Sequence, residues 1–82
     1  MPEINPLDVI AECIEKCKAT TDREQIAHYV AEALGLLQID NSEDDAFHML
    51  GSAVADTAQT DKEHGGVLFE VWTQLETQRQ TP

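Results

Sequence analysis

Apolar residues recur three and four positions apart along four stretches of the chain, and no stretch alternates apolar and polar residues as a strand would. This spacing gathers apolar side chains on one face of an α-helix. It predicts helices over about 6–19, 22–35 and 43–59, and a last helix that begins at 61 or 67 and ends near 79. Because 82 residues suffice for one domain, we expect an all-α fold, a small single-domain bundle of four short helices. Three longer helices are the alternative.

Capping residues mark where three of these helices begin. Asn5 followed by Pro6 is typical of a helix start, because Asn accepts from free backbone amides and proline fits the first turn. Thr21 and Glu24 have the spacing of a capping box. Ser42 precedes three carboxylates, which the helix dipole favours in a first turn.

Glycines leave two helix boundaries open. Gly35 has the position of a left-handed cap that would end the second helix, although that helix could instead continue to Gln38. A second capping box begins at Thr60, but Gly65-Gly66 follows, and each glycine inside a helix costs ~1 kcal/mol relative to alanine. The last helix therefore starts either near Asp61 or after the glycines.

The helical spacing also predicts a core. The residues expected on the inward faces, in chain order, are Leu7, Ile10, Ile14, Cys17, Ile26, Val30, Ala33, Leu34, Leu37, Ala46, Leu50, Ala53, Val54, Thr57, Leu68, Val71, Trp72 and Leu75. Cys13 and Cys17 are expected to be buried thiols, with burial raising the pKa of Cys17 and making it a poor nucleophile.

The chain is strongly acidic, with 16 Asp and Glu against 5 Lys and Arg and a formal net charge of -11. Between Glu24 and Asp61 it carries eight carboxylates and no Lys or Arg. This charge exceeds what the solubility of a small domain requires. It disfavours direct binding to nucleic acid or an anionic membrane, and it favours a partner protein with a basic surface.

Several functional classes lack their sequence signals. No nucleophile with its base, phosphate loop or redox pair is visible, and the histidines and cysteines lack zinc-site spacing, so we expect no enzyme activity, cofactor or metal. The segment 40–44 lacks the glycine and the distal glutamate of a calcium loop. No apolar run approaches the ~20 residues of a membrane span, and no signal peptide is visible, so we expect a cytoplasmic protein.

The third helix carries the first candidate site. Asp45, Met49, Ser52 and Asp56 are spaced along one outward stripe, with Asp44 beside it. A methionine surrounded by carboxylates suits docking to a basic groove, because the carboxylates attract arginine while methionine adapts its shape. The alternative is an ordinary solvated helix face.

A second acidic stripe lies on the second helix, where Glu24, His28 and Glu32 follow one another at four-residue spacing. A histidine between two carboxylates is one arrangement used by pH switches. The alternative is a solvated, screened surface.

The last helix has more apolar residues than one inward face can hold. Phe69 falls on a different side from Leu68, Val71, Trp72 and Leu75, and is therefore a candidate contact residue. The surplus indicates either a helix packed on two sides or a surface for a partner or a homodimer.

Taken together, these features predict a non-enzymatic acidic module that occupies a basic, nucleic-acid-binding surface of a partner protein and inhibits or regulates it. In charge and size the chain resembles the nucleic-acid-mimicking inhibitors of phages and mobile elements, and small immunity proteins. The alternative is a structural or accessory subunit, or a homodimer, held through the apolar surplus of the last helix. Salt distinguishes the two, because electrostatic binding weakens with ionic strength and apolar binding does not.

Overall fold

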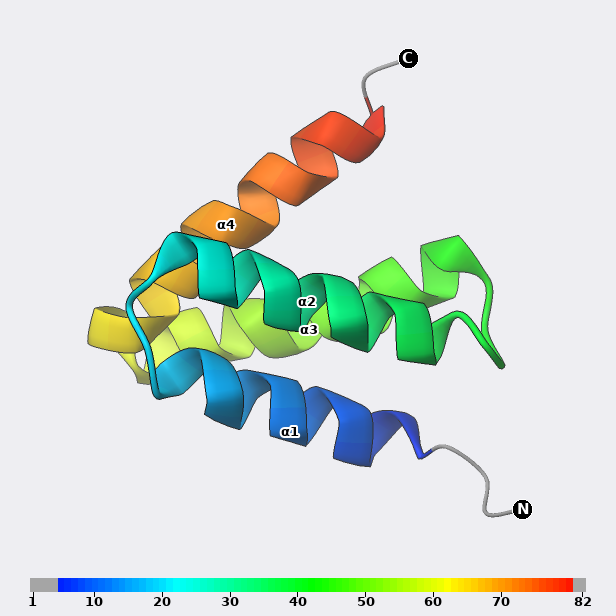
Figure 1. The fold of residues 1–82 in the computed structure, drawn as a ribbon, viewed down its shortest axis with the longest axis horizontal. Helices are drawn as coiled ribbons and strands as arrows, with labels where there is room; N and C mark the ends of the chain where they lie inside the picture. The colour runs from blue at the N-terminus through cyan, green and yellow to red at the C-terminus, as the bar shows by residue number, and fades with distance from the viewer. Residues whose placement is uncertain (1–4, 81–82) are drawn as a thin grey trace.

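The computed structural model describes residues 5–80, apart from the side chains at positions 64 and 80. Within this range the chain forms α1 (Pro6–Lys18), α2 (Arg23–Leu37), α3 (Glu43–Thr60) and α4 (Lys62–Gln80), and no strand. The predicted all-α fold of four helices is confirmed. Figure 1 shows α4 running at an angle to the other helices, with its C-terminal end pointing away from α1.

The caps of α1 and α3 are those predicted, whereas the cap of α2 is not. The side chain of Asn5 accepts from the amide of Leu7, and that of Ser42 accepts from the amide of Asp45. For α2 the predicted box at Thr21 is wrong, because Asp22 is the N-cap and its Oδ1 accepts from the amide of Glu24 at 2.9 Å. A carboxylate next to the first helical residue serves this role as well as threonine does.

The second helix passes through Gly35 and ends at Leu37. No described residue has a positive φ, so the predicted left-handed cap at Gly35 is wrong and the alternative, continuation towards Gln38, is confirmed. The physical reason is that Leu37 is only 1% exposed. Two further helical residues place this leucine in the core, and its burial stabilises the longer helix.

A single residue, Asp61, separates α3 from α4. The last helix therefore takes the earlier of the two predicted starts and includes both glycines. The predicted capping box at Thr60 is wrong, because the Thr60 hydroxyl donates to the carbonyl of Asp56 within α3. Gly65 is needed where it lies, since a Cβ there would be 2.6 Å from Cα of Ala58.

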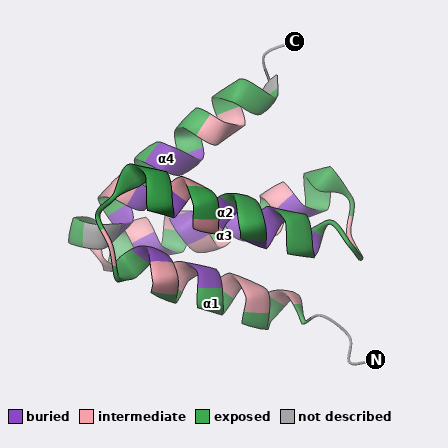
Figure 2. Cartoon of the chain, in the orientation of Figure 1, coloured by how far each residue is buried: buried purple, intermediate pink, exposed green. Residues whose placement is uncertain are grey.

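Among the described residues, thirteen apolar side chains from all four helices form the core: Cys13, Cys17, Ile26, Val30, Ala33, Leu34, Leu37, Ala46, Leu50, Val54, Leu68, Val71 and Trp72. In Figure 2 the outward turns of α1 and α2 are exposed while buried segments gather toward the middle of the molecule. Thr57 is buried as predicted, and its hydroxyl donates to the carbonyl of Ala53. The polar group is thereby satisfied inside the core.

Helix α1 contributes less to the core than predicted. Leu7, expected on its inward face, is 75% exposed, and Ile10 and Ile14 are only half-buried. Cys13 and Cys17 are instead the buried pair, so the inward face is centred on the two thiols. Leu7 lies in the first turn of α1 and is not part of the core cluster.

Candidate functional site

A groove of about 380 Å³ lies between α3 and α4. The residues that line it include Phe47, Gly51, Ser52, Phe69, Trp72 and Glu76. The rings of Phe47 and Trp72 lie side by side, with centroids 5.3 Å apart and an interplanar angle of 41°. Phe69 is 46% exposed. The groove is thus an aromatic surface, open to solvent, between two adjacent helices.

A glycine lets Trp72 approach α3 closely. A Cβ at Gly51 would lie 3.1 Å from Cζ2 of Trp72 and 3.3 Å from its Nε1. The indole is almost fully buried, and its Nε1 donates to Oε1 of Glu76 at 2.7 Å. This hydrogen bond satisfies a buried donor and fixes a carboxylate at the edge of the aromatic surface.

The C-terminal end of α4 is joined to the start of α3 by Arg79. Its guanidinium Cζ lies 4.4 Å from the ring centroid of Phe47, and its Nε donates to Oε1 of Glu43 at 2.7 Å. A second hydrogen bond runs from Nη2 to Oδ1 of Asp44. These bonds to Glu43 and Asp44 raise the pKa of Arg79. An arginine of the chain itself therefore occupies a position on an aromatic ring between carboxylates.

The structure separates the candidate residues of α3 into four groups. Ser52 lines the groove, together with Phe69 of α4. Asp45 and Asp56 are exposed, and no ion pair to either is found among the described residues. Asp44 is paired with Arg79. Met49 was expected to be an outward apolar contact, but it is half-buried and packs against the core, which leaves less of it available to a partner.

The second acidic stripe is exposed on α2. Nε2 of His28 lies 3.6 Å from Oε2 of Glu32, and both side chains are more than half exposed. Glu24 is exposed in the first turn of the same helix. Because solvent and salt screen such a pair, the arrangement by itself provides little coupling to the fold.

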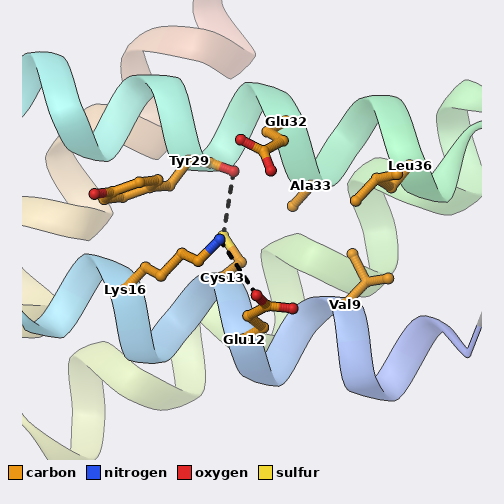
Figure 3. A pocket seen from close by; sticks show the side chains of 8 residues that line it. All are labelled: Val9, Glu12, Cys13, Lys16, Tyr29, Glu32, Ala33 and Leu36. Carbon is orange, nitrogen blue, oxygen red and sulfur yellow. Dashed lines mark hydrogen bonds and ion pairs between the residues drawn. The ribbon is translucent and has the colours of Figure 1, made fainter.

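A smaller pocket lies between α1 and α2, and Figure 3 shows the eight side chains that line it, all from these two helices. Nζ of Lys16 is 3.3 Å from Oε1 of Glu12 and 5.8 Å from the ring centroid of Tyr29. Cys13 Sγ donates to the carbonyl of Tyr29. The volume of about 30 Å³ has room for one or two waters and excludes larger ligands.

The two cysteines are free and buried. A hydrogen bond between the thiols, together with burial, raises the pKa of Cys13. The same hydrogen bond lowers the pKa of Cys17 while burial acts in the opposite sense, so the predicted rise at Cys17 is wrong. Cys17 is nevertheless only 1% exposed, and lack of access limits its reactivity.

Sequence reasoning placed Glu76 near Phe69, but it did not identify the hydrogen bond of Glu76 to Trp72, the role of Gly51 in the groove, or the contact of Arg79 with Phe47 at one end of the aromatic surface. The four-residue spacing of Trp72 and Glu76 on one helix was a usable signal for their hydrogen bond. The approach of Gly51 to Trp72 and of Arg79 to Phe47 depends on how two helices pack, and has no local signal.

Within the described part of the chain, no three His, Cys, Asp or Glu side chains lie close enough together to hold a metal ion. None of the helices described has both the length and the apolar composition needed to cross a membrane. Comparisons with protein-family models, curated proteins and solved structures give no significant match for this chain.

Proposed function

We propose that this chain is a non-enzymatic, acidic protein-binding module that occupies a basic surface of a partner protein and so inhibits or regulates it. The partner surface is of the kind with which proteins bind nucleic acid, and the module competes for it through its carboxylates. We place this activity in the cytoplasm, where the two free thiols would remain reduced.

The distribution of ion pairs is the observation that carries this proposal. Four of the five basic residues are already paired with carboxylates: Lys16 with Glu12, Lys18 with Asp61, Arg23 with Glu70, and Arg79 with Glu43 and Asp44. Asp45 and Asp56 on the outer side of α3 have no such partner among the described residues. These two carboxylates are therefore available to cations supplied from outside, in a molecule whose net charge attracts them.

Charge reversal tests the proposal. The tagged protein is used to capture partners from host lysate at low salt, and elution in steps of rising salt is compared with that of the Asp45→Lys/Asp56→Lys variant. We expect a basic protein to elute at moderate salt from the unmodified chain and not to be captured by the variant. Glu15→Lys/Asp40→Lys is the matched control, because it reverses two exposed carboxylates that lie outside α3. Capture that is insensitive to salt and to Asp45→Lys/Asp56→Lys would refute the proposal.

A second candidate function is that of an accessory subunit or homodimer held through α4. It is favoured by Phe69, a large aromatic side chain that is 46% exposed beside an open groove. Light scattering over a range of protein concentrations tests it. A dimer that persists at high salt and is lost in Phe69→Ala would establish this function in place of the first.

A further inference from the structure

We propose that the groove between α3 and α4 holds an arginine-bearing amphipathic helix of the partner, with an apolar side chain against Phe69 and a cation on Glu76. This inference rests on the proposed function and names the part of the partner that is recognised. It makes the groove, rather than the acidic face of α3 alone, the centre of the interface.

The shape of the groove suits a short stretch of helix. Its lining on α3 extends from Phe47 to Ala55, which corresponds to about 12 Å, or roughly two helical turns. An amphipathic helix that lies in such a groove inserts apolar side chains from one face, spaced by one turn. Phe69 and the exposed Thr73 form one wall of the groove, and Ser52 lies in the opposite wall.

The charges around the groove indicate that the bound helix is basic. Glu76 is held there by the indole of Trp72, and this bond engages only one of its two carboxylate oxygens. Asp56 follows Ser52 by one helical turn on α3. Arg79 shows which cation fits, because it already lies over Phe47 and bonds two carboxylates at one end of the same aromatic surface. A partner's arginine would find a carboxylate beside aromatic side chains at Glu76 as well, where the indole of Trp72 lies against that carboxylate.

The same charges argue against a second copy of this chain as the occupant. Two copies, each with a net charge of -11, would bring Glu76 and Asp56 of one molecule toward the acidic surface of the other. Like charges facing each other across an interface are unfavourable, whereas a basic helix gains the opposite interaction. The groove therefore fits a different protein of opposite charge better than it fits itself.

The test uses the full chain and a synthetic peptide of about 15 residues, the length near which isolated helices begin to form in water. The peptide carries leucines one turn apart on one face and arginines on both flanks. Trp72, the only tryptophan of the chain, lines the groove, so its fluorescence reports binding there. Two further peptides, one with the leucines replaced by alanine and one with the arginines replaced by glutamate, separate the apolar contribution from the charge.

We expect the leucine-arginine peptide to bind and the other two to bind at least about tenfold more weakly. Phe69→Ala should weaken binding about tenfold or more, because it removes the exposed aromatic anchor. Ile39→Ala is its matched control, since Ile39 is 64% exposed outside the groove.

Glu76→Gln should weaken peptide binding several-fold while keeping an acceptor for the indole of Trp72, and its control Glu15→Gln should leave peptide binding unchanged. Thr73→Arg is a second groove variant, in which an added side chain should block the peptide.

Equal binding by the unmodified chain, Phe69→Ala and Thr73→Arg would overturn the groove as the site, because the peptide would then be held by surface charge alone. Absence of peptide binding would overturn it too. Neither result refutes the proposed function, which the Asp45→Lys/Asp56→Lys capture experiment tests separately. Self-association that Phe69→Ala abolishes would place a second copy in the groove and overturn the inference.

Discussion

The indole Nε1 of Trp72 donates a 2.7 Å hydrogen bond to Oε1 of Glu76, one turn further along α4. Trp72 is 3% exposed, so the only other way to satisfy this donor would be a buried water or another side chain. The bond consequently links stability to the candidate site, because the carboxylate that satisfies the indole also lines the groove.

Replacement of Glu76 by alanine should destabilise the fold by about 1–3 kcal/mol, because it leaves a buried N–H without its acceptor. Replacement by glutamine should cost less, since the amide oxygen can accept the same bond. Urea unfolding followed by tryptophan fluorescence measures both variants. Helix propensity favours alanine slightly over glutamine, so an alanine variant as stable as the glutamine variant would show that this bond contributes nothing.

Gly65 and Gly66 are adjacent in α4 but meet different surroundings. A Cβ at Gly65 would lie 2.6 Å from Cα of Ala58 and 2.7 Å from the carbonyl oxygen of Thr57, whereas one at Gly66 would have nothing within 4 Å. Gly65→Ala should therefore force α3 and α4 apart and destabilise the protein by about 1–3 kcal/mol. Gly66→Ala should stabilise it by about 0.5–1 kcal/mol through the unfolded chain.

Thermal and urea unfolding of the two glycine variants provide the measurement. The gain in helix propensity is the same at both positions, so the difference between the variants isolates the contact with α3. Equal stabilisation by both substitutions would contradict the close approach of α3 and α4 at Gly65.

Periodicity alone predicted most of the inward faces. On α2 all five expected residues, Ile26, Val30, Ala33, Leu34 and Leu37, are buried. Phe69 was likewise expected on a different side from Leu68, Val71 and Trp72, and it is exposed while these three are buried. Such predictions succeed because the direction of a side chain on a helix follows from its position in the 3.6-residue repeat.

The features that periodicity missed depend on where neighbouring helices lie. Leu7 has the correct spacing for the core. The helical repeat of α1, however, does not indicate whether a neighbouring helix extends far enough to cover its first turn. Gly35 has the composition of a cap, yet the burial of Leu37 decided that the helix continues. The groove itself depends on contacts between α3 and α4, such as that of Phe47 with Trp72, whose residues are distant in sequence. The acidic stripe of α3 and the exposed Phe69 were accessible to sequence reasoning, whereas the packing of Phe47 and Trp72 between the two helices was not.

Leu7 and Leu50 should respond very differently to truncation. Leu50 is 0% exposed in the core, so Leu50→Ala should cost about 2–5 kcal/mol through lost burial and the cavity left behind. Leu7 is 75% exposed, so Leu7→Ala should stay within about 0.5 kcal/mol of the unmodified chain. Urea unfolding measures both. A large loss of stability in Leu7→Ala would contradict the exposure of Leu7, because it would mean that this side chain is packed against other residues.

The two cysteines should be protected from thiol reagents while the chain is folded. Cys13 is 4% exposed, and its pKa is raised by the hydrogen bond to Cys17 and by burial, so it lacks both access and thiolate. Ser52→Cys offers an exposed thiol on the same scaffold as a control. With a chromogenic disulfide reagent at pH 8, one thiol of this variant should react at once, and the native pair should react only as urea opens the fold. Immediate reaction of both native thiols would contradict their burial.

Arg79 should hold the last turn of α4 against α3. Replacing it with glutamine removes its contacts to Glu43, Asp44 and the ring of Phe47 together. We expect faster amide hydrogen exchange in the last turn of α4, with little change in the core. High salt should also speed exchange in the last turn of α4 of the unmodified chain, because exposed ion pairs are screened.

Arg23→Gln is the control, since that side chain pairs with Glu70 near the middle of α4 instead of at its end. If exchange in the last turn of α4 were unchanged in Arg79→Gln, helix packing alone would hold that turn against α3, and the contacts of Arg79 would add nothing to it.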